Sequence, residues 1–245
     1  MSTNYQTGMG GYANPVVLSP EQQVLASRFV SRTYGWMFLG LMFTAIVSLA
    51  TASSQTAIQY ILVNRWVFYG LMFAELGLVF WLSASQAKLS PLAATLGFLA
   101  YSGLNGLTLS VILLAYTMSS VANVFFISSA MFGGLALFGA VTKKDLTGLG
   151  AFVGMGLWGI ILVGLVNMFI RSDALSSALG LVGVVVFAGL TAYDSQRIRA
   201  MAYSYSLSNN RAAGDKGAVF GALMLYLNFI NLFLSLLRLF GDRRR

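Results

Sequence analysis

The sequence predicts an all-α membrane protein, a bundle of helices that cross the bilayer several times. Hydrophobic residues make up 58% of its 245 residues and charged residues only 9%, whereas a soluble domain carries roughly a quarter charged residues. The apolar residues form blocks of about 20, the length of a helix that spans a bilayer. Only three prolines are present, and the apolar runs lack the alternation of a membrane barrel.

Seven such blocks fill most of the chain and leave no room for a second soluble domain. They are Tyr34–Ala52, Trp66–Ser83, Pro91–Leu114, Ser120–Val141, Leu146–Ile170, Ala174–Tyr193 and Gly217–Phe240. We therefore expect a tail with the start of a surface helix at residues 1–27, a seven-helix membrane domain at residues 28–241 and a basic tail at residues 242–245.

The residues before the first span predict how it begins. Met1–Asn14 is rich in Gly, Ser and Asn, and we expect it to be flexible. Ser19 has the pattern of a helix N-cap, with Pro20 at the first helical position and Gln22 closing a capping box. A short amphipathic helix on the membrane surface is expected to follow. No secretory signal precedes the first span, which should stay as an anchor.

Within the second span, Glu75 lies near the middle of LMFAELGLVFW. An ionised carboxylate is expensive in hydrocarbon, so such a residue is a functional candidate by default. It is either a neutral acid that hydrogen-bonds a neighbouring helix or part of an ion or proton path. In the fifth span, Gly150 and Gly154 have the GxxxG spacing that lets two helices approach closely.

The sixth span ends in LTAYDSQRIR, where Asp194 precedes a charge cluster of Arg197 and Arg199 that is predicted to be cytoplasmic. From the residues alone, Asp194 is either a helix-end carboxylate paired with Arg197 or a functional group.

In the seventh span, Asn228 and Asn231 lie three residues apart and form a polar seam that calls for partners across a helix interface. Arg238, later in the same span, is able to snorkel to the membrane surface.

The distribution of basic residues predicts the orientation. Nine of them fall in the segments on the amino-terminal side of the membrane, and only Arg65 and Arg171 fall in the loops opposite. The nine are Arg28, Arg32, Lys88, Lys143, Lys144, Arg197, Arg199, Arg211 and Lys216. The amino terminus is therefore predicted to face the cytoplasm. Seven spans then place the basic tail outside; a re-entrant last segment is the alternative.

Composition also excludes several classes of protein. The chain has no cysteine and no histidine, which excludes thiol and Ser-His catalysis and His/Cys zinc sites. An intramembrane aspartyl protease needs a second Asp, which the last span lacks. A retinal protein needs a lysine in the middle of a span, and the lysines of this chain lie in loops or at a span edge. No phosphate-binding loop is present. We therefore expect no enzyme activity and no cofactor. We also expect no nucleic-acid partner, because the net charge of +8 is interpreted as loop charge that sets the orientation in the membrane.

Two stretches near the end of the chain carry a resemblance to a known family. The motif Tyr193-Asp194-Ser195-Gln196-Arg197-Ile198, followed by LYLNFINLF from Leu225, resembles the Bax inhibitor family of membrane proteins in its bacterial branch. Glu75 and its neighbours in the second span fit as well. The resemblance covers about Arg28 to Gly241.

This resemblance implies six helices around a central C-terminal helix and a calcium leak controlled by pH, with the calcium ion as permeant. It implies that Asp194 pairs with an Asp in the last span, but this chain has Asn228 at that position. An amide does not ionise, so the coupled titration of two carboxylates is lost. The pH response is then expected to move to lower pH or to vanish.

Two hypotheses follow. In the first, the protein is a pH-sensitive calcium leak of the bacterial inner membrane, with Asp194 as its gate or proton sensor and with Asp194 and Glu75 as transient calcium contacts. In the second, it is a non-transporting regulator of a membrane-bound ATP-dependent protease of the FtsH type, or a modulator of stress or cell death. Calcium flux distinguishes the two hypotheses.

Overall fold

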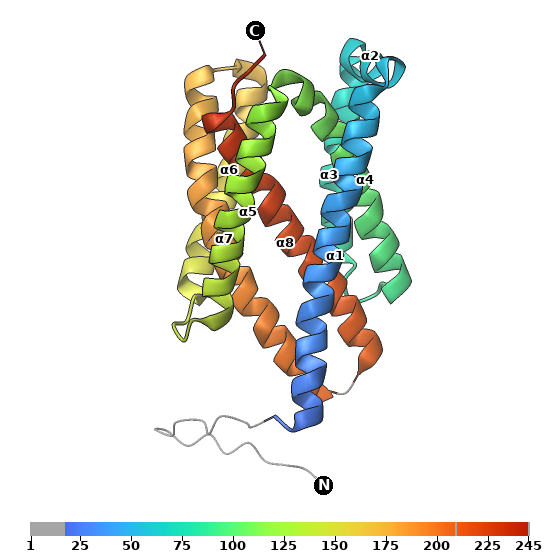
Figure 1. Ribbon diagram of the computed structural model, residues 1–245, viewed down its shortest axis with the longest axis vertical. Coiled ribbons are helices and arrows are strands. Elements are labelled where there is room, and N and C mark those ends of the chain that lie inside the picture. Colours follow the sequence, from blue (N-terminus) through green and yellow to red (C-terminus); the bar gives the residue numbers. More distant parts are fainter. Residues whose placement is uncertain (1–17, 209, 245) are drawn as a thin grey trace.

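The structure, a computed structural model, describes residues 18–208 and 210–244. These residues form eight α-helices (Figure 1). Their bounds are α1 Pro20–Ser53, α2 Gln55–Val63, α3 Arg65–Ala84, α4 Pro91–Ala115, α5 Met118–Val141, α6 Thr147–Ile170, α7 Asp173–Ser208 and α8 Arg211–Phe240. Seven of the eight are long and apolar enough to cross a membrane, and each matches one of the seven predicted spans, the fifth of which starts one residue before its helix. The predicted all-α membrane bundle is therefore confirmed.

Helix α1 begins as the sequence predicts but continues further than expected. The Ser19 hydroxyl accepts a hydrogen bond from the Gln22 backbone N–H, and the Gln22 side chain accepts one from the Ser19 N–H. The expected separate surface helix is wrong, because one uninterrupted helix runs from Pro20 to Ser53. Its 34 residues extend about 51 Å, well beyond a hydrocarbon core of about 30 Å. The predicted flexible tail, Met1–Asn14, lies outside the described residues.

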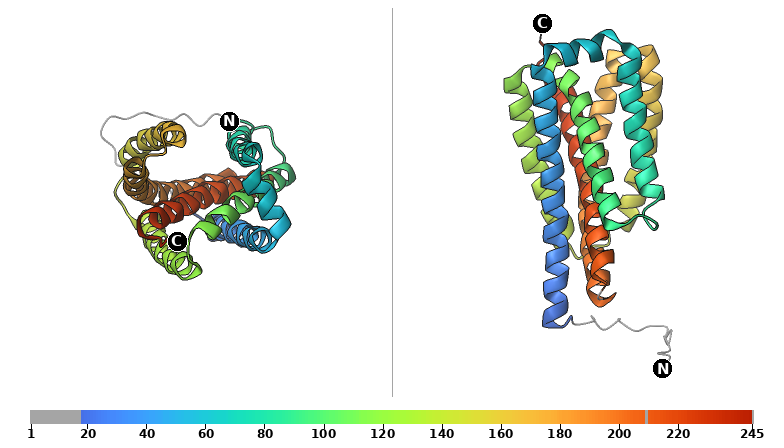
Figure 2. Two further views of the ribbon diagram at one scale, coloured as in Figure 1. Left: turned by 90° about the horizontal axis from the view of Figure 1, so that it is seen from above. Right: turned by 90° about the vertical axis from the view of Figure 1, so that its right-hand side faces the viewer.

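The short helix α2 is absent from the sequence prediction. Its nine residues are too few to span a bilayer. It follows α1 directly, and the Ser54 side chain caps its first turn. In Figure 2 it lies across the end of the bundle where α1 finishes and α3 starts.

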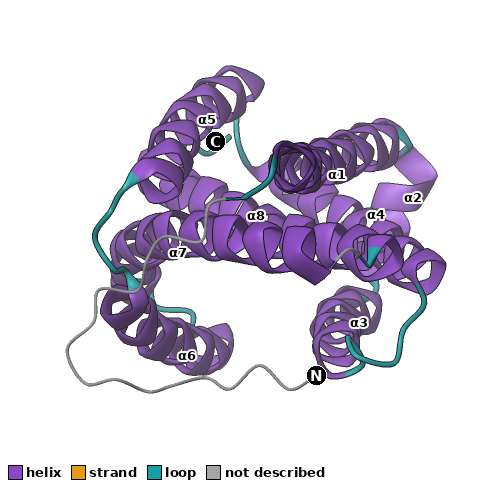
Figure 3. Cartoon of the chain, turned by 90° about the horizontal axis from the view of Figure 1, so that it is seen from below, coloured by secondary structure: helices purple, strands orange, loops and turns teal. Residues whose placement is uncertain are grey.

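Helix α8 is the centre of the bundle. In the apolar 18-residue segment of α8, 78% of the residues are buried. The corresponding fractions are 6% in α3 and 11% in α6. Four helices pack directly on α8, namely α1, α4, α5 and α7. The other two spans stand one layer further out, because α3 packs on α4 and α6 packs on α7 (Figure 3). The predicted central C-terminal helix is thus present, with two of the six surrounding helices in its second layer.

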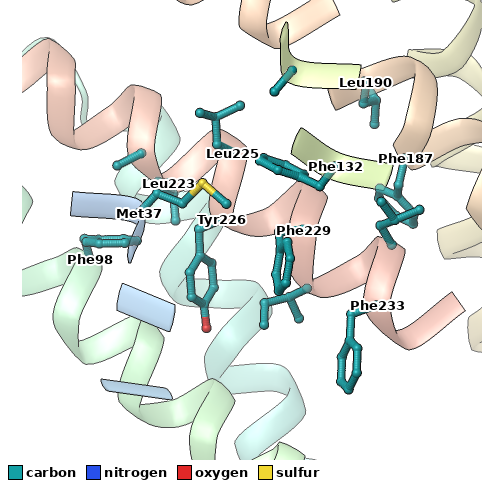
Figure 4. Close-up of a cluster of buried hydrophobic side chains, with 14 of the residues drawn as sticks. Met37, Phe98, Phe132, Phe187, Leu190, Leu223, Leu225, Tyr226, Phe229 and Phe233 are labelled. Carbon is teal, nitrogen blue, oxygen red and sulfur yellow. The ribbon is translucent and has the colours of Figure 1, made fainter. Parts of the chain in front are cut away.

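Aromatic side chains fill the core on both sides of α8. Tyr226 meets the rings of Phe98 and Tyr101 from α4 at centroid distances of 5.6 and 5.8 Å. Phe229, less than one turn further along, meets Phe132 from α5 at 5.5 Å (Figure 4). Edge-to-face contacts of this kind add to the packing of buried rings. They fix the rotation of α8 relative to α4 and α5.

The two ends of the described chain lie at opposite ends of the bundle (Figure 1). We call these the amino-terminal end, where α1 starts, and the carboxyl-terminal end, where residues 242–244 lie. Tyr116 and Arg243 form an antiparallel β-bridge. Thr117 N–H donates to the Asp242 carbonyl at 2.9 Å, and Arg244 N–H donates to the Ala115 carbonyl at 3.0 Å. Helix α8 therefore crosses the bundle completely, and the re-entrant alternative is wrong.

Candidate functional site

Asp194 is a buried carboxylate at the interface of the two helices that share the largest contact in the bundle. It lies on α7 and is only 7% exposed. Its Oδ2 accepts a hydrogen bond of 2.8 Å from Nδ2 of Asn228 on α8, a residue that is 4% exposed. An amide that donates to a carboxylate forms a charge-assisted bond when the acid is ionised. The structure therefore brings together the two residues that the sequence motifs put forward.

Two glycines hold α5 and α6 close to α7 just before Asp194. A Cβ atom built on Gly139 of α5 would lie 2.0 Å from the Ala192 carbonyl oxygen, and one on Gly150 of α6 would lie 2.5 Å from the Tyr193 ring. Only glycine permits such approach of one helix to another. Gly150 therefore behaves as its GxxxG pattern predicts. A Cβ on Gly154, its partner in the pattern, would meet open space.

The residues after Asp194 hold the α5–α6 loop. Gln196 Nε2 donates to the Lys144 carbonyl at 2.8 Å, and the Leu146 N–H donates to Gln196 Oε1 at 3.0 Å. Arg199 Nη1 donates to the Ala140 carbonyl at 2.7 Å, near the end of α5. A cation is stabilising there, because the last carbonyls of a helix carry partial negative charge. The sequence did not predict these loop contacts, which no local pattern encodes.

Arg197 does not pair with Asp194. Its side chain is exposed, and the one salt bridge found within residues 18–208 and 210–244 joins Arg32 of α1 to Asp215 of α8. A direct salt bridge, the helix-end pairing that was one of two alternatives for Asp194, is therefore not formed among the described residues. Asp194 accepts its hydrogen bond from Asn228 of α8, whereas the Arg197 side chain, less than one turn further along α7, is exposed.

Glu75 is held by hydrogen bonds from the neighbouring helix α4. Thr108 Oγ1 donates to its Oε1 at 2.5 Å, and Asn105 Nδ2 donates to its Oε2 at 3.3 Å. The Asn105 amide also donates to the Tyr101 hydroxyl at 3.3 Å. These contacts are the hydrogen bonds to a neighbouring helix that one of the two interpretations of Glu75 predicts. The other reading, an ion or proton path, stays a prediction.

A third polar contact, which the sequence reasoning missed, joins α8 to α1 and α4. The Tyr226 hydroxyl lies 2.6 Å from Thr44 Oγ1, and Thr44 Oγ1 donates to the Ser102 carbonyl at 2.8 Å. All three residues are buried. In the sequence, this contact is indicated only by the presence of Thr44, Ser102 and Tyr226 within apolar spans.

The two other polar residues of α8 differ from each other. Asn231 Nδ2 donates at 2.8 Å to the Leu227 carbonyl of its own helix. The predicted partner across an interface is therefore wrong for Asn231, although it is correct for Asn228. Arg238 lies in the last turn of α8 and is exposed, as a snorkelling side chain would be.

Comparison with known proteins now decides the family. The family model "Inhibitor of apoptosis-promoting Bax1" matches residues 26–245, nearly the whole chain. The chain belongs to the Bax inhibitor family. Among its relatives, the inner membrane protein YbhL of Escherichia coli K12 is 45% identical over 216 residues, which cover 88% of this chain and 92% of YbhL. A protein of Borreliella burgdorferi is 41% identical over 229 residues, covering 93% and 98% of the two chains.

As a Bax inhibitor family member, the chain is a multi-pass integral membrane protein. It has two separate carboxylate sites, one buried at Asp194 and one partly buried at Glu75. Asp194 is bound between α7 and α8, and Glu75 is bound between α3 and α4. Helix α3 does not pack on α7 in the described part of the chain. No group of three or more acidic side chains able to hold a metal is found in that part either. The structure thus does not bring Glu75 and Asp194 into one site.

Proposed function

We propose that this Bax inhibitor family protein is a calcium-permeable leak whose gate is the contact between Asp194 and Asn228. The buried hydrogen bond of 2.8 Å between these side chains carries the proposal. It joins the central helix α8 to α7 where both helices are surrounded by apolar residues. Separation of the two side chains would expose a carboxylate and an amide, which are oxygen ligands that Ca²⁺ accepts.

The described conformation is the closed state in this proposal. Phe229 follows Asn228 on α8 and is packed between Phe125 and Phe132 of α5, at 5.7 and 5.5 Å. Closely packed aromatic rings exclude water, and hydrophobic constrictions of this kind close channels. Opening requires α8 to move away from α5 and α7 together. Glu75 then supplies a second carboxylate, on the opposite side of α8, that a calcium ion meets during passage.

The amide at residue 228 sets the pH dependence of the leak. Two carboxylates that lie close together repel each other when both are ionised. Such a pair therefore keeps one shared proton up to a higher pH than a single carboxylate does. Asp194 faces an amide instead, so the wild-type leak is expected to respond only weakly to pH between about 6 and 8.

Calcium flux into liposomes that contain the purified protein tests this proposal. We expect flux in the wild type with a weak dependence on pH, lower flux in Asp194→Asn, and a pH response gained within the same window in Asn228→Asp. The matched control is Asn231→Asp, one turn along α8, which introduces the same charge where the side chain bonds its own helix. Absence of flux at every pH overturns the leak. A pH response that is the same in the wild type and in Asn228→Asp overturns the gate.

A second function, regulation of a membrane-bound protease, is favoured by the helix lengths. The 34 residues of α1 and the 36 of α7 extend about 51 and 54 Å, so both helices project beyond a hydrocarbon core of about 30 Å. The projecting ends carry Arg28, Arg32 and Arg199, on the side that positive charge predicts to be cytoplasmic. Co-purification of a membrane protease that is lost when these arginines are replaced, in a protein without calcium flux, would select this function. In either case we place the protein in the bacterial inner membrane.

A further inference from the structure

The carboxyl-terminal end of the bundle contains an apolar cavity between the two outer helices. It has a volume of about 380 Å³, within the size range of small-molecule sites, about 300–1,000 Å³. Its apolar walls come from α2, α3, α4 and α6. They are formed by Ile61, Leu62, Phe68, Tyr69, Val111 and Met168. Arg171, the residue that ends α6, also lines the cavity and supplies its one charge among the lining residues.

The cavity is open because α3 and α6 pack on different neighbours. Helix α3 rests on α4 and α6 rests on α7, and over the described residues the two do not pack along each other (Figure 3). They meet further inside the membrane, where Phe80 of α3 stacks on Trp158 of α6 with ring centroids 6.5 Å apart. From Met168 to Trp158 is a rise of about 15 Å along α6. This depth equals one leaflet of a hydrocarbon core about 30 Å thick.

Arg171 adopts a backbone conformation that is unfavourable for its residue type. Its φ of 55° and ψ of 39° are left-handed, and it is the one residue other than glycine with positive φ in the described chain. Glycine is the usual residue at such a helix end, and an arginine costs about 1 kcal/mol there. Residues with backbone strain of this kind cluster at functional sites. The guanidinium forms no salt bridge with a carboxylate of residues 18–208 or 210–244.

We propose that the cavity binds one anionic phospholipid from the surrounding leaflet, with its phosphate on Arg171 and an acyl chain between α3 and α6. A guanidinium at the end of a span lies at the depth of the headgroups and binds a phosphate through two parallel hydrogen bonds. The apolar walls and the depth of one leaflet fit an acyl chain. A free phosphate ion would use Arg171 alone and would leave the apolar walls unoccupied.

Native mass spectrometry of the full-length protein in detergent, titrated with phosphatidylglycerol, tests the site. We expect one phosphatidylglycerol to bind more tightly than all others, and about tenfold weaker binding in Arg171→Gly, because a charge-assisted contact is lost. Glycine relieves the backbone strain, so this variant keeps its fold. The matched control is Arg244→Ala, which removes another exposed arginine at the same end of the bundle and should leave binding unchanged.

Two further measurements locate the acyl chain. A phosphatidylglycerol with a photoactivatable acyl chain should crosslink to peptides that contain Val111 or Met168, and Val111→Phe, which fills the cavity, should abolish the crosslink while Arg171 remains. Excess inorganic phosphate should not compete. Equal binding in the wild type and Arg171→Gly, crosslinks that bypass both peptides, or displacement by inorganic phosphate would each overturn the proposal. None of these outcomes depends on calcium flux.

Discussion

The Tyr226 hydroxyl on α8 lies 2.6 Å from Thr44 Oγ1 on α1, and Thr44 in turn donates to the Ser102 carbonyl on α4. Since the Thr44 proton is used toward Ser102, the Tyr226 hydroxyl is the donor of the first bond. Three helices are therefore joined by one short chain of buried hydrogen bonds. This chain lies on the face of α8 opposite the Asp194 contact, so the central helix is fixed by polar contacts on two sides.

Replacing Tyr226 by phenylalanine should destabilise the bundle by about 1 kcal/mol, the usual net contribution of one hydrogen bond. The ring keeps its contacts with Phe98 and Tyr101, and Thr44 keeps its bond to Ser102. Thermal unfolding of the protein in detergent measures the change. Tyr60→Phe is the control, because Tyr60 lies on α2 with 64% of its side chain exposed. Equal stability of both variants would mean that the chain of hydrogen bonds contributes nothing.

Gly139→Ala should be strongly destabilising, by about 1–3 kcal/mol, because its methyl group would lie 2.0 Å from the Ala192 carbonyl oxygen. Helix α5 would have to move away from α7 two residues before Asp194. Gly134→Ala on the same helix meets open space, and alanine there should leave stability unchanged or raise it by up to about 1 kcal/mol. Thermal unfolding distinguishes the pair, and similar losses in both would refute the close approach of α5 to α7.

Glu75→Gln should lower calcium flux while the fold is retained. Gln keeps its carbonyl oxygen as the acceptor for Thr108 but presents its NH₂ group, which does not accept, toward Asn105. If the charge of Glu75 assists the ion, its loss is expected to reduce flux about tenfold, which corresponds to about 1.4 kcal/mol. Glu21→Gln, an exposed position in the first turn of α1, serves as the control in the same liposome assay. Normal flux in Glu75→Gln would exclude Glu75 from the ion path.

A chain shortened to end at Gly241 should loosen the α4–α5 connection. Asp242 and Arg244 supply three hydrogen bonds to it, through the Asp242 carbonyl, the Arg244 N–H and the bond from the Asp242 N–H to Ser120 Oγ at 2.9 Å. Without them the Thr117 amide should exchange with deuterium at least about tenfold faster, because a free amide exchanges without local unfolding. Arg243→Ala retains the backbone bonds and should not change this rate. Unchanged exchange in the shortened chain would show that the tail contributes no restraint.

The local features of the fold were predictable because nearby residues determine them. The apolar blocks define seven spans, and Ser19 and Gln22 define the start of α1. Helix α2 was not predictable by the same reasoning, since its nine residues are too few for a span. The continuation of α1 from Pro20 was also missed, because an amphipathic segment fits both a surface helix and the end of a long span.

Contacts between distant residues were predictable only where family resemblance supplied them. Asp194 and Asn228 are 34 positions apart, and their pairing followed from two motifs rather than from the physics of either residue. Asn105 and Thr108 lie 30 and 33 positions from Glu75, and no motif linked them to it. For Asn231, the rule that intramembrane amides seek another helix was wrong, because the Leu227 carbonyl one turn back satisfies it.

The place of α8 in the bundle also determines when the molecule can be completed. A ribosome synthesises α1–α7 before α8, so the helices of the periphery enter the membrane first and the core enters last. Until α8 arrives, Asp194 lacks Asn228 and Thr44 lacks Tyr226, and the α4–α5 connection lacks its β-bridge to Arg243. The contacts at the centre of the bundle therefore form last, because the helix that makes them is the last to be synthesised.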